Sequence, residues 1–201
     1  RMLKSHVLVR KLVGIETAGS MNLLFTDKTG TITKGKLEVV EFMLGNGKKY
    51  IDVSSLSNRY QKIFKNSLVY NNESIYDEEE QKVIGGNLTD QAILNYVHLK
   101  RHSSVSILKE VRFTSEKKYS YVDIMEDKKK YRYVKGAPEV LLKYTNRYLD
   151  EEGFKKLLFQ QENILKKVNN LTEKGIRVLA VCYSENCSST LSDLILVGFL
   201  L

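Results

Sequence analysis

The stretch ILKEVRFTSEKKYSYVDIMEDKKKYRYVKGAP, residues 107–138, decides the fold class of this sequence. Apolar and polar residues alternate over 107–113, 119–125 and 131–135, the pattern of strands that bury one face. Asp127 and the lysines after it supply the tip of a turn between the last two segments. The stretch therefore predicts neighbouring antiparallel strands.

Helices are predicted before and after these strands in the sequence. Apolar residues recur at helical spacing over 53–70 and again over 88–97, where Asn87 is suited to the N-cap. Pro138 is suited to the first residue of a helix, and a long helix is expected over 154–174, closed by the glycine that follows. Together, these helices and strands predict an α+β domain, in which helices pack on an antiparallel sheet. Further strands are expected at residues 36–43, 176–183 and 194–201, with a hairpin turn at 45–47.

A second region precedes this domain. Residues 22–26 form a short apolar run bounded by turn residues, which predicts a buried strand. The run leads into Asp27 and then KTGT, residues 28–31, which offer a cation, hydroxyl groups and a flexible backbone. A carboxylate at the C-terminal edge of a sheet can accept a phosphoryl group. The local pattern alone favours the alternative, a polar turn with a capping aspartate.

The string DKTGTIT, residues 27–33, resembles the phosphorylation motif of P-type ATPases. KSHVLVRKLVGIETAG, residues 4–19, resembles the segment that links the fourth membrane helix of these pumps to that motif. The resemblance extends over the whole chain. It implies that residues 1–33 begin a haloacid-dehalogenase-like α/β phosphorylation domain, and that residues 34–201 are a nucleotide-binding domain inserted into it.

The resemblance implies catalytic roles for four residues of the motif. Asp27 would accept the γ-phosphoryl group of ATP, and Lys28, Thr29 and Thr31 would surround that group with charge and hydrogen-bond donors. Asp27 and Thr29 would also be ligands of Mg²⁺, so that ATP and Mg²⁺ are the expected cofactors. Related phosphatases carry a second aspartate, acting as acid and base, where this sequence has Thr29. A free-standing phosphatase is therefore disfavoured.

Two segments resemble the part of the family's pocket that holds adenine. In GNLTDQA, residues 86–92, Asp90 stands where an acidic residue hydrogen-bonds the adenine amino group. Phe113 and the TSEKK that follows resemble a segment in which the phenylalanine stacks on adenine. Lys118, at the end of this segment, would lie beside the pocket.

Two further segments resemble other parts of the family's nucleotide pocket. KGAPE, residues 135–139, resembles a motif of type II pumps, which implies that Lys135 reaches the nucleotide and that Gly136 lets the ligand approach the backbone. GIRVLA, residues 175–180, resembles a strand whose arginine, here Arg177, contacts phosphates.

Taken one at a time, these residues have ordinary structural alternatives. Asp90 suits the first turn of a helix, Phe113 suits a core, and Arg177 suits a surface. Residues 30–37 also approach the Walker A pattern, but Leu37 has no hydroxyl group for Mg²⁺. A P-loop NTPase is therefore disfavoured.

Composition and charge bear on the alternatives to a pump. The net charge of +8 fits an anionic ligand, but the lysines are scattered rather than clustered with aromatic residues, so no nucleic-acid partner is expected. A non-catalytic nucleotide sensor is the main alternative to a pump. Cys182 and Cys187 are expected to be reduced, and the three histidines match no metal-ligand spacing.

The resemblance also implies what lies outside these residues. The family's TGD and GDGxND motifs are not in the sequence, and no stretch approaches the length of a membrane span. We therefore expect a fragment whose partners are the remaining phosphorylation, actuator and membrane domains of the same chain, with the transported cation bound outside it. The expected location is the cytoplasmic side of an integral membrane protein, in the plasma membrane, with Ca²⁺ as the leading candidate ion.

Overall fold

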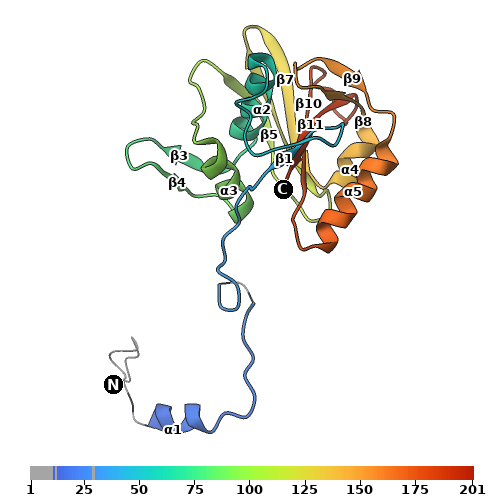
Figure 1. The fold of residues 1–201 in the computed structure, drawn as a ribbon. Coiled ribbons are helices and arrows are strands. Elements are labelled where there is room, and N and C mark those ends of the chain that lie inside the picture. The colour runs from blue at the N-terminus through green and yellow to red at the C-terminus, as the bar shows by residue number, and fades with distance from the viewer. Residues whose placement is uncertain (1–10, 12, 29) are drawn as a thin grey trace. The chain divides into compact units, whose positions relative to one another are not determined.

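The computed structural model describes residues 11, 13–28 and 30–201, and the chain divides into two compact units. The first unit is Arg1–Lys36 and the second is Leu37–Leu201 (Figure 1). In the first unit the helix α1 (Val13–Gly19) buries none of its residues. The division lies close to the boundary expected after residue 33, while the assignment of the first unit to a phosphorylation domain stays a prediction. Among the described residues, no helix is long and apolar enough to cross a membrane.

The apolar run at residues 22–26 does not form the predicted buried strand. The side chains of Leu23, Leu24 and Phe25 are 70%, 68% and 88% exposed. An extended segment is stable only when other strands take up its backbone hydrogen bonds, and no described strand pairs with this one. The prediction is therefore wrong for this chain, because hydrophobicity alone cannot hold a strand that has no pairing partner.

The second unit is an α+β domain, which confirms the predicted fold class (Figure 1). Its large sheet has nine strands, seven of them in the order β2-β1-β11-β10-β7-β6-β5. Of the other two, β8 pairs with β11, and β9 pairs with β8. All neighbours are antiparallel except β8, which runs parallel to β11. These strands are β1 (Phe42–Met43), β2 (Lys49–Tyr50), β5 (Ser106–Val111), β6 (Tyr119–Glu126), β7 (Lys129–Gly136), β8 (Thr145–Leu149), β9 (Lys155–Leu157), β10 (Leu179–Ser184) and β11 (Leu194–Leu200).

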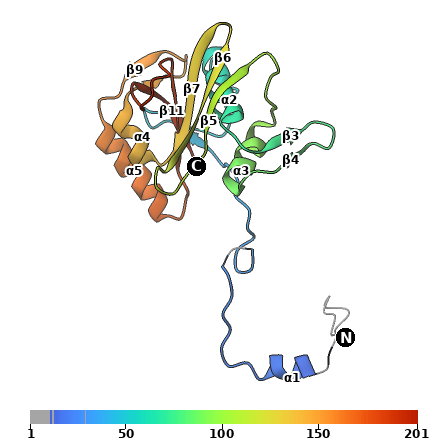
Figure 2. The same cartoon turned by 180° about the vertical axis from the view of Figure 1, so that it is seen from behind.

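Helices cover both faces of this sheet, as the two opposite views show (Figures 1 and 2). α2 (Asn58–Tyr70) and α3 (Leu88–Val97) pack on one face. α4 (Pro138–Leu141), the short 3₁₀ turn Leu142–Tyr144 and α5 (Gln161–Glu173) lie on the other face. A separate hairpin of β3 (Ile75–Asp77) and β4 (Lys82–Ile84) stands between α2 and α3 in the sequence.

The alternation read from the sequence produces two hydrophobic cores. On β6, Val122 and Ile124 belong to the core under α2, whereas Tyr121 belongs to the core under α4 and α5. Val181 and Cys182 of β10 divide in the same way. Successive side chains of a strand point to opposite faces, so each strand contributes to both cores.

Two local features predicted from the sequence, a hairpin tip and a helix N-cap, are confirmed. Asp127 and Lys128 form the tip between β6 and β7 with φ of +49° and +63°, the left-handed region that tight hairpin turns require. Asn87 caps α3 by accepting hydrogen bonds from the backbone N–H groups of Thr89 and Asp90, each at 3.0 Å. α2 begins at Asn58, later than the expected residue 53.

The predicted helix at 154–174 is wrong in its first part. Lys155–Leu157 is the strand β9, which pairs with β8, and the helix α5 begins only at Gln161. Gly153, with φ of +77°, makes the turn that brings this segment back to β8. Tertiary pairing therefore overrides the helical spacing of the apolar residues. The expected strands at 36–43 and 176–183 are likewise shorter, since β1 covers Phe42–Met43 and β10 begins at Leu179.

A buried ion pair joins β6 to β7. Asp123 and Arg132 are directly opposite each other, and the guanidinium donates to both carboxylate oxygens at 2.6 and 2.7 Å. The side chains are only 8% and 2% exposed. The Arg132 guanidinium also lies 4.3 Å from the ring centre of Tyr121. A bidentate, stacked arrangement of this kind compensates the cost of burying both charges.

Candidate functional site

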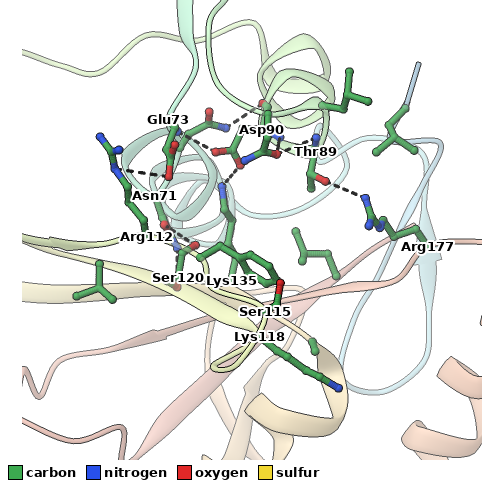
Figure 3. Close-up of a pocket in the computed structure, with 18 of the residues that line it drawn as sticks. Asn71, Glu73, Thr89, Asp90, Arg112, Ser115, Lys118, Ser120, Lys135 and Arg177 are labelled. Atoms are coloured by element: carbon green, nitrogen blue, oxygen red, sulfur yellow. Dashed lines mark hydrogen bonds and ion pairs between the residues drawn. The ribbon is translucent and has the colours of Figure 1, made fainter. Parts of the chain in front are cut away.

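The second unit contains a pocket of about 970 Å³ at one end of the sheet (Figure 3). Segments far apart in the sequence form its wall: the end of α2, the start of α3, the ends of β5 and β7, and the start of β10. Residues that line it include Asn71, Asn72, Glu73, Thr89, Asp90, Arg112, Phe113, Ser115, Lys118, Ser120, Lys135 and Arg177. Five residues expected from the resemblance to bind nucleotide are thus brought together: Asp90, Phe113, Lys118, Lys135 and Arg177.

A buried ion pair between Asp90 and Lys135 forms the inner wall (Figure 3). Lys135 lies near the end of β7 and Asp90 lies in the first turn of α3, and the two residues are only 7% and 2% exposed. The Lys135 ammonium donates to one carboxylate oxygen of Asp90, and the backbone N–H of Glu73 donates to the other oxygen at 2.9 Å. Burial lowers the pKa of Lys135, although the neighbouring carboxylate acts in the opposite direction.

Phe113 offers an aromatic face to the pocket. It lies two residues after the end of β5, and 54% of the residue is exposed, so it is not a core side chain. The turn after it closes with a hydrogen bond of 2.7 Å from the backbone N–H of Lys118 to the carbonyl of Thr114. The Lys118 side chain points away from the Asp90–Lys135 pair, and its ammonium lies 3.3 Å from Glu139 (Figure 3).

Arg177 lies at the opposite side of the opening. Its guanidinium donates to the hydroxyl of Thr89 at 3.1 Å (Figure 3). Among the described residues this hydroxyl is the only hydrogen-bond partner of the guanidinium, so several of its donors can meet an anion. Thr89 was not singled out from the sequence, although it lies beside Asp90 in the first turn of α3.

Gly136 is not among the pocket's lining residues. A Cβ atom at this position would lie 2.5 Å from the carbonyl oxygen of Lys118 and 2.6 Å from the Cβ of Tyr119. The structure therefore explains this glycine by the close packing of β7 against the start of β6. A contact between Gly136 and a ligand stays a prediction.

The DKTGTIT string lies in the first unit, which we describe by itself. Asp27, Lys28 and Thr31 are exposed, and Thr29 lies outside the described residues. The carbonyl of Lys28 accepts hydrogen bonds from the backbone N–H groups of Ile32 and Thr33, at 3.0 and 3.1 Å.

Among the described residues, no three His, Cys, Asp or Glu side chains are grouped so that they could hold a metal ion. Mg²⁺ is commonly held by one or two carboxylates together with phosphate oxygens and water. The Asp27 carboxylate therefore fits as one ligand of a magnesium ion that a bound phosphate also coordinates.

Comparison with known families identifies the class of this protein. The family model of the P-type ATPase cytoplasmic domain N matches residues 59–199. The chain therefore belongs to the P-type ATPases.

Relatives of this chain include proteins named calcium-transporting ATPases. The chain is 32% identical to calcium-transporting ATPase 1 of Lactococcus lactis, over 98% of this chain and 24% of that protein. It is 28% identical to calcium-transporting ATPase 1 of Bacillus cereus, over 94% of this chain and 22% of that protein. It is 30% identical to calcium-transporting ATPase 1 of Saccharomyces cerevisiae, over 97% of this chain and 24% of that protein. The chain thus spans about a quarter of the length of these relatives.

Proposed function

We propose that the pocket binds ATP and that the chain is the nucleotide-binding part of a calcium-transporting pump. The observation that carries the proposal is the convergence of Asp90, Phe113, Lys118, Lys135 and Arg177 on one pocket. An exposed aromatic face beside cations is suited to a ligand that combines a flat heterocycle with phosphates. The names of the relatives favour Ca²⁺ as the transported ion.

Within the pocket, each side chain has a distinct task. The ring of Phe113 stacks on adenine, since more than half of the residue is exposed. The Asp90 carboxylate accepts a hydrogen bond from the adenine amino group, and the ion pair with Lys135 holds that carboxylate in place. Arg177 and Lys118, at the opening, contact the phosphates.

In the complete protein, Asp27 is the phosphoryl acceptor. A carboxylate oxygen of Asp27 bonds to the γ-phosphorus of ATP while the bond from that phosphorus to the β–γ bridging oxygen breaks, so that ADP leaves and an aspartyl-phosphate forms. Lys28, Thr29 and Thr31 supply charge and hydrogen-bond donors to the transferred group. Mg²⁺, when bound, neutralises the phosphate charge.

Other parts of the complete protein are needed for turnover. Further phosphorylation, actuator and membrane domains of the same chain would position Asp27, hydrolyse the aspartyl-phosphate and bind the cation. This part of the protein would then face the cytoplasm, with the plasma membrane as the proposed location. These partners follow from the family and from the quarter of the relatives' length that the chain spans.

Replacement of Phe113 by alanine tests the stacking contact. We expect Phe113→Ala to weaken ATP binding by about fivefold, the equivalent of roughly 1 kcal/mol, because the aromatic face is lost. The thermal midpoint should change little, since this side chain is not part of either core. Calorimetric titration with ATP and a thermal melt measure the two quantities.

Phe154→Ala is the matched control. Phe154 is 53% exposed, close to the 54% of Phe113, and it does not line the pocket. Its removal should leave the dissociation constant for ATP unchanged. Equal dissociation constants for all three proteins would contradict the stacking role of Phe113.

A further inference from the structure

We propose that Asn71 and Asn72 are positioning residues of the nucleotide pocket, each acting on one member of the Asp90–Lys135 pair. They follow α2 directly and are 4% and 2% exposed. The inference rests on the proposed function, because it concerns how the same pocket is held in shape. Neither residue was singled out by the sequence motifs.

Asn71 fixes the strand that carries Lys135. Its side-chain amide donates to the carbonyl of Ser120 on β6 at 3.1 Å and to the carbonyl of Tyr133 on β7 at 3.2 Å. The Ser120 hydroxyl donates back to the amide oxygen at 3.1 Å. Ser120 is paired with Lys135 in the sheet register. Asn71 therefore holds the backbone of both strands at the level of Lys135.

Asn72 fixes the helix that carries Asp90. Its amide donates to the backbone carbonyl of Asp90 at 3.1 Å, and its amide oxygen accepts from the N–H of Ser74 at 2.8 Å. The residue between them, Glu73, donates its backbone N–H to the Asp90 carboxylate at 2.9 Å. The segment 72–74 thus holds Asp90 by its backbone and by its side chain.

The two asparagines are adjacent in sequence, whereas Asp90 and Lys135 are 45 residues apart. A buried ion pair is favourable only when its geometry is good. The dipeptide connects β7 and α3 by buried hydrogen bonds. The guanidinium of Arg101 also donates to the carbonyls of Tyr70 and Asn72, at 3.1 and 2.5 Å. The dipeptide therefore sets the distance between the carboxylate for adenine and the ammonium beside it.

Alanine variants of the 201-residue chain test this role. We expect Asn71→Ala and Asn72→Ala each to raise the dissociation constant for ATP by about tenfold, the equivalent of about 1.4 kcal/mol. Tyr60→Phe is the control, because it removes one buried hydrogen bond, from the Tyr60 hydroxyl to the carbonyl of Val197 at 2.7 Å, in the core under α2. The control should lose stability but keep the affinity of the unaltered chain.

A double-mutant cycle separates positioning from a general loss of stability. In a Lys135→Ala background, Asn71→Ala should weaken ATP binding by less than about twofold, because the group that it positions is gone. A full tenfold effect in that background would overturn the inference, and so would unchanged affinity in both single variants. If the unaltered chain does not bind ATP, the proposed function fails instead.

A measurement on the unaltered chain covers the case in which the variants do not fold. The side-chain amide protons of Asn71 and Asn72 should exchange with water much more slowly than those of Asn169, which is exposed on α5. Nuclear magnetic resonance of the amide groups measures these rates. Exchange as fast as that of Asn169 would overturn the inference, since a mobile amide holds nothing in place.

Discussion

Asp27→Asn in the full-length protein is expected to abolish formation of the phosphoenzyme. The substitution preserves the size of the side chain but replaces the nucleophilic carboxylate oxygen by an amide, which cannot form an acyl phosphate with ATP. Wild-type protein incubated with ATP labelled at the γ-phosphate should retain acid-stable label that hydroxylamine removes, and the variant should retain none. Binding of ATP should persist, and removal of a negative charge near the γ-phosphate favours it.

The control for this experiment is Asp127→Asn. Asp127 is exposed at the tip of the β6–β7 hairpin, where asparagine tolerates the same left-handed backbone. Its phosphoenzyme level should match the wild type. Label retained on full-length Asp27→Asn would contradict the assignment of Asp27 as the acceptor.

Asp123→Ala is expected to cause the largest loss of stability. The substitution leaves the Arg132 guanidinium, only 2% exposed, without its bidentate carboxylate partner. Removal of one partner of a buried ion pair costs about 3–5 kcal/mol. The free energy of unfolding, measured by urea denaturation of the 201-residue chain, should fall by that amount.

Glu80→Ala provides the comparison for an exposed pair. Glu80 pairs with Lys82, and the two side chains are 61% and 55% exposed. Removal of an exposed pair of this kind should cost at most about 1 kcal/mol. A similar small loss for Asp123→Ala would show that the Asp123–Arg132 pair is not a structural element of the sheet.

The sequence predicted those parts of the fold that depend on neighbouring residues. The β6–β7 hairpin follows from strict alternation on both sides of a tip that tolerates positive φ, and α3 follows from a capping asparagine and helical spacing. Two segments whose structure depends on strand pairing rather than on their own apolar pattern were predicted wrongly. β9 is a strand because it pairs with β8, and residues 22–26 are not a strand because no described strand pairs with them.

In the site, the residues within recognisable motifs were predicted, whereas residues defined by contacts with distant segments were not. Motif resemblance selected Asp90, Phe113 and Lys135, which do lie in one pocket. It did not select Asn71 or Asn72, because their partners are backbone groups of segments distant in sequence. A pair of asparagines after a helix predicts a turn and nothing more. Only the folded sheet shows that their amides reach β6, β7 and α3.

The most direct test of the central claim is a titration of the 201-residue chain with ATP, followed residue by residue by nuclear magnetic resonance. We expect a dissociation constant in the high-micromolar to millimolar range, about −4 to −5 kcal/mol, because the residues proposed to bind adenine lie together while the proposed function places other phosphate ligands outside this chain. The largest shifts should fall on residues around Phe113 and Lys135. No shift of these residues at 10 mM ATP, on the order of ten times the expected dissociation constant, would contradict the claim that this pocket binds the nucleotide.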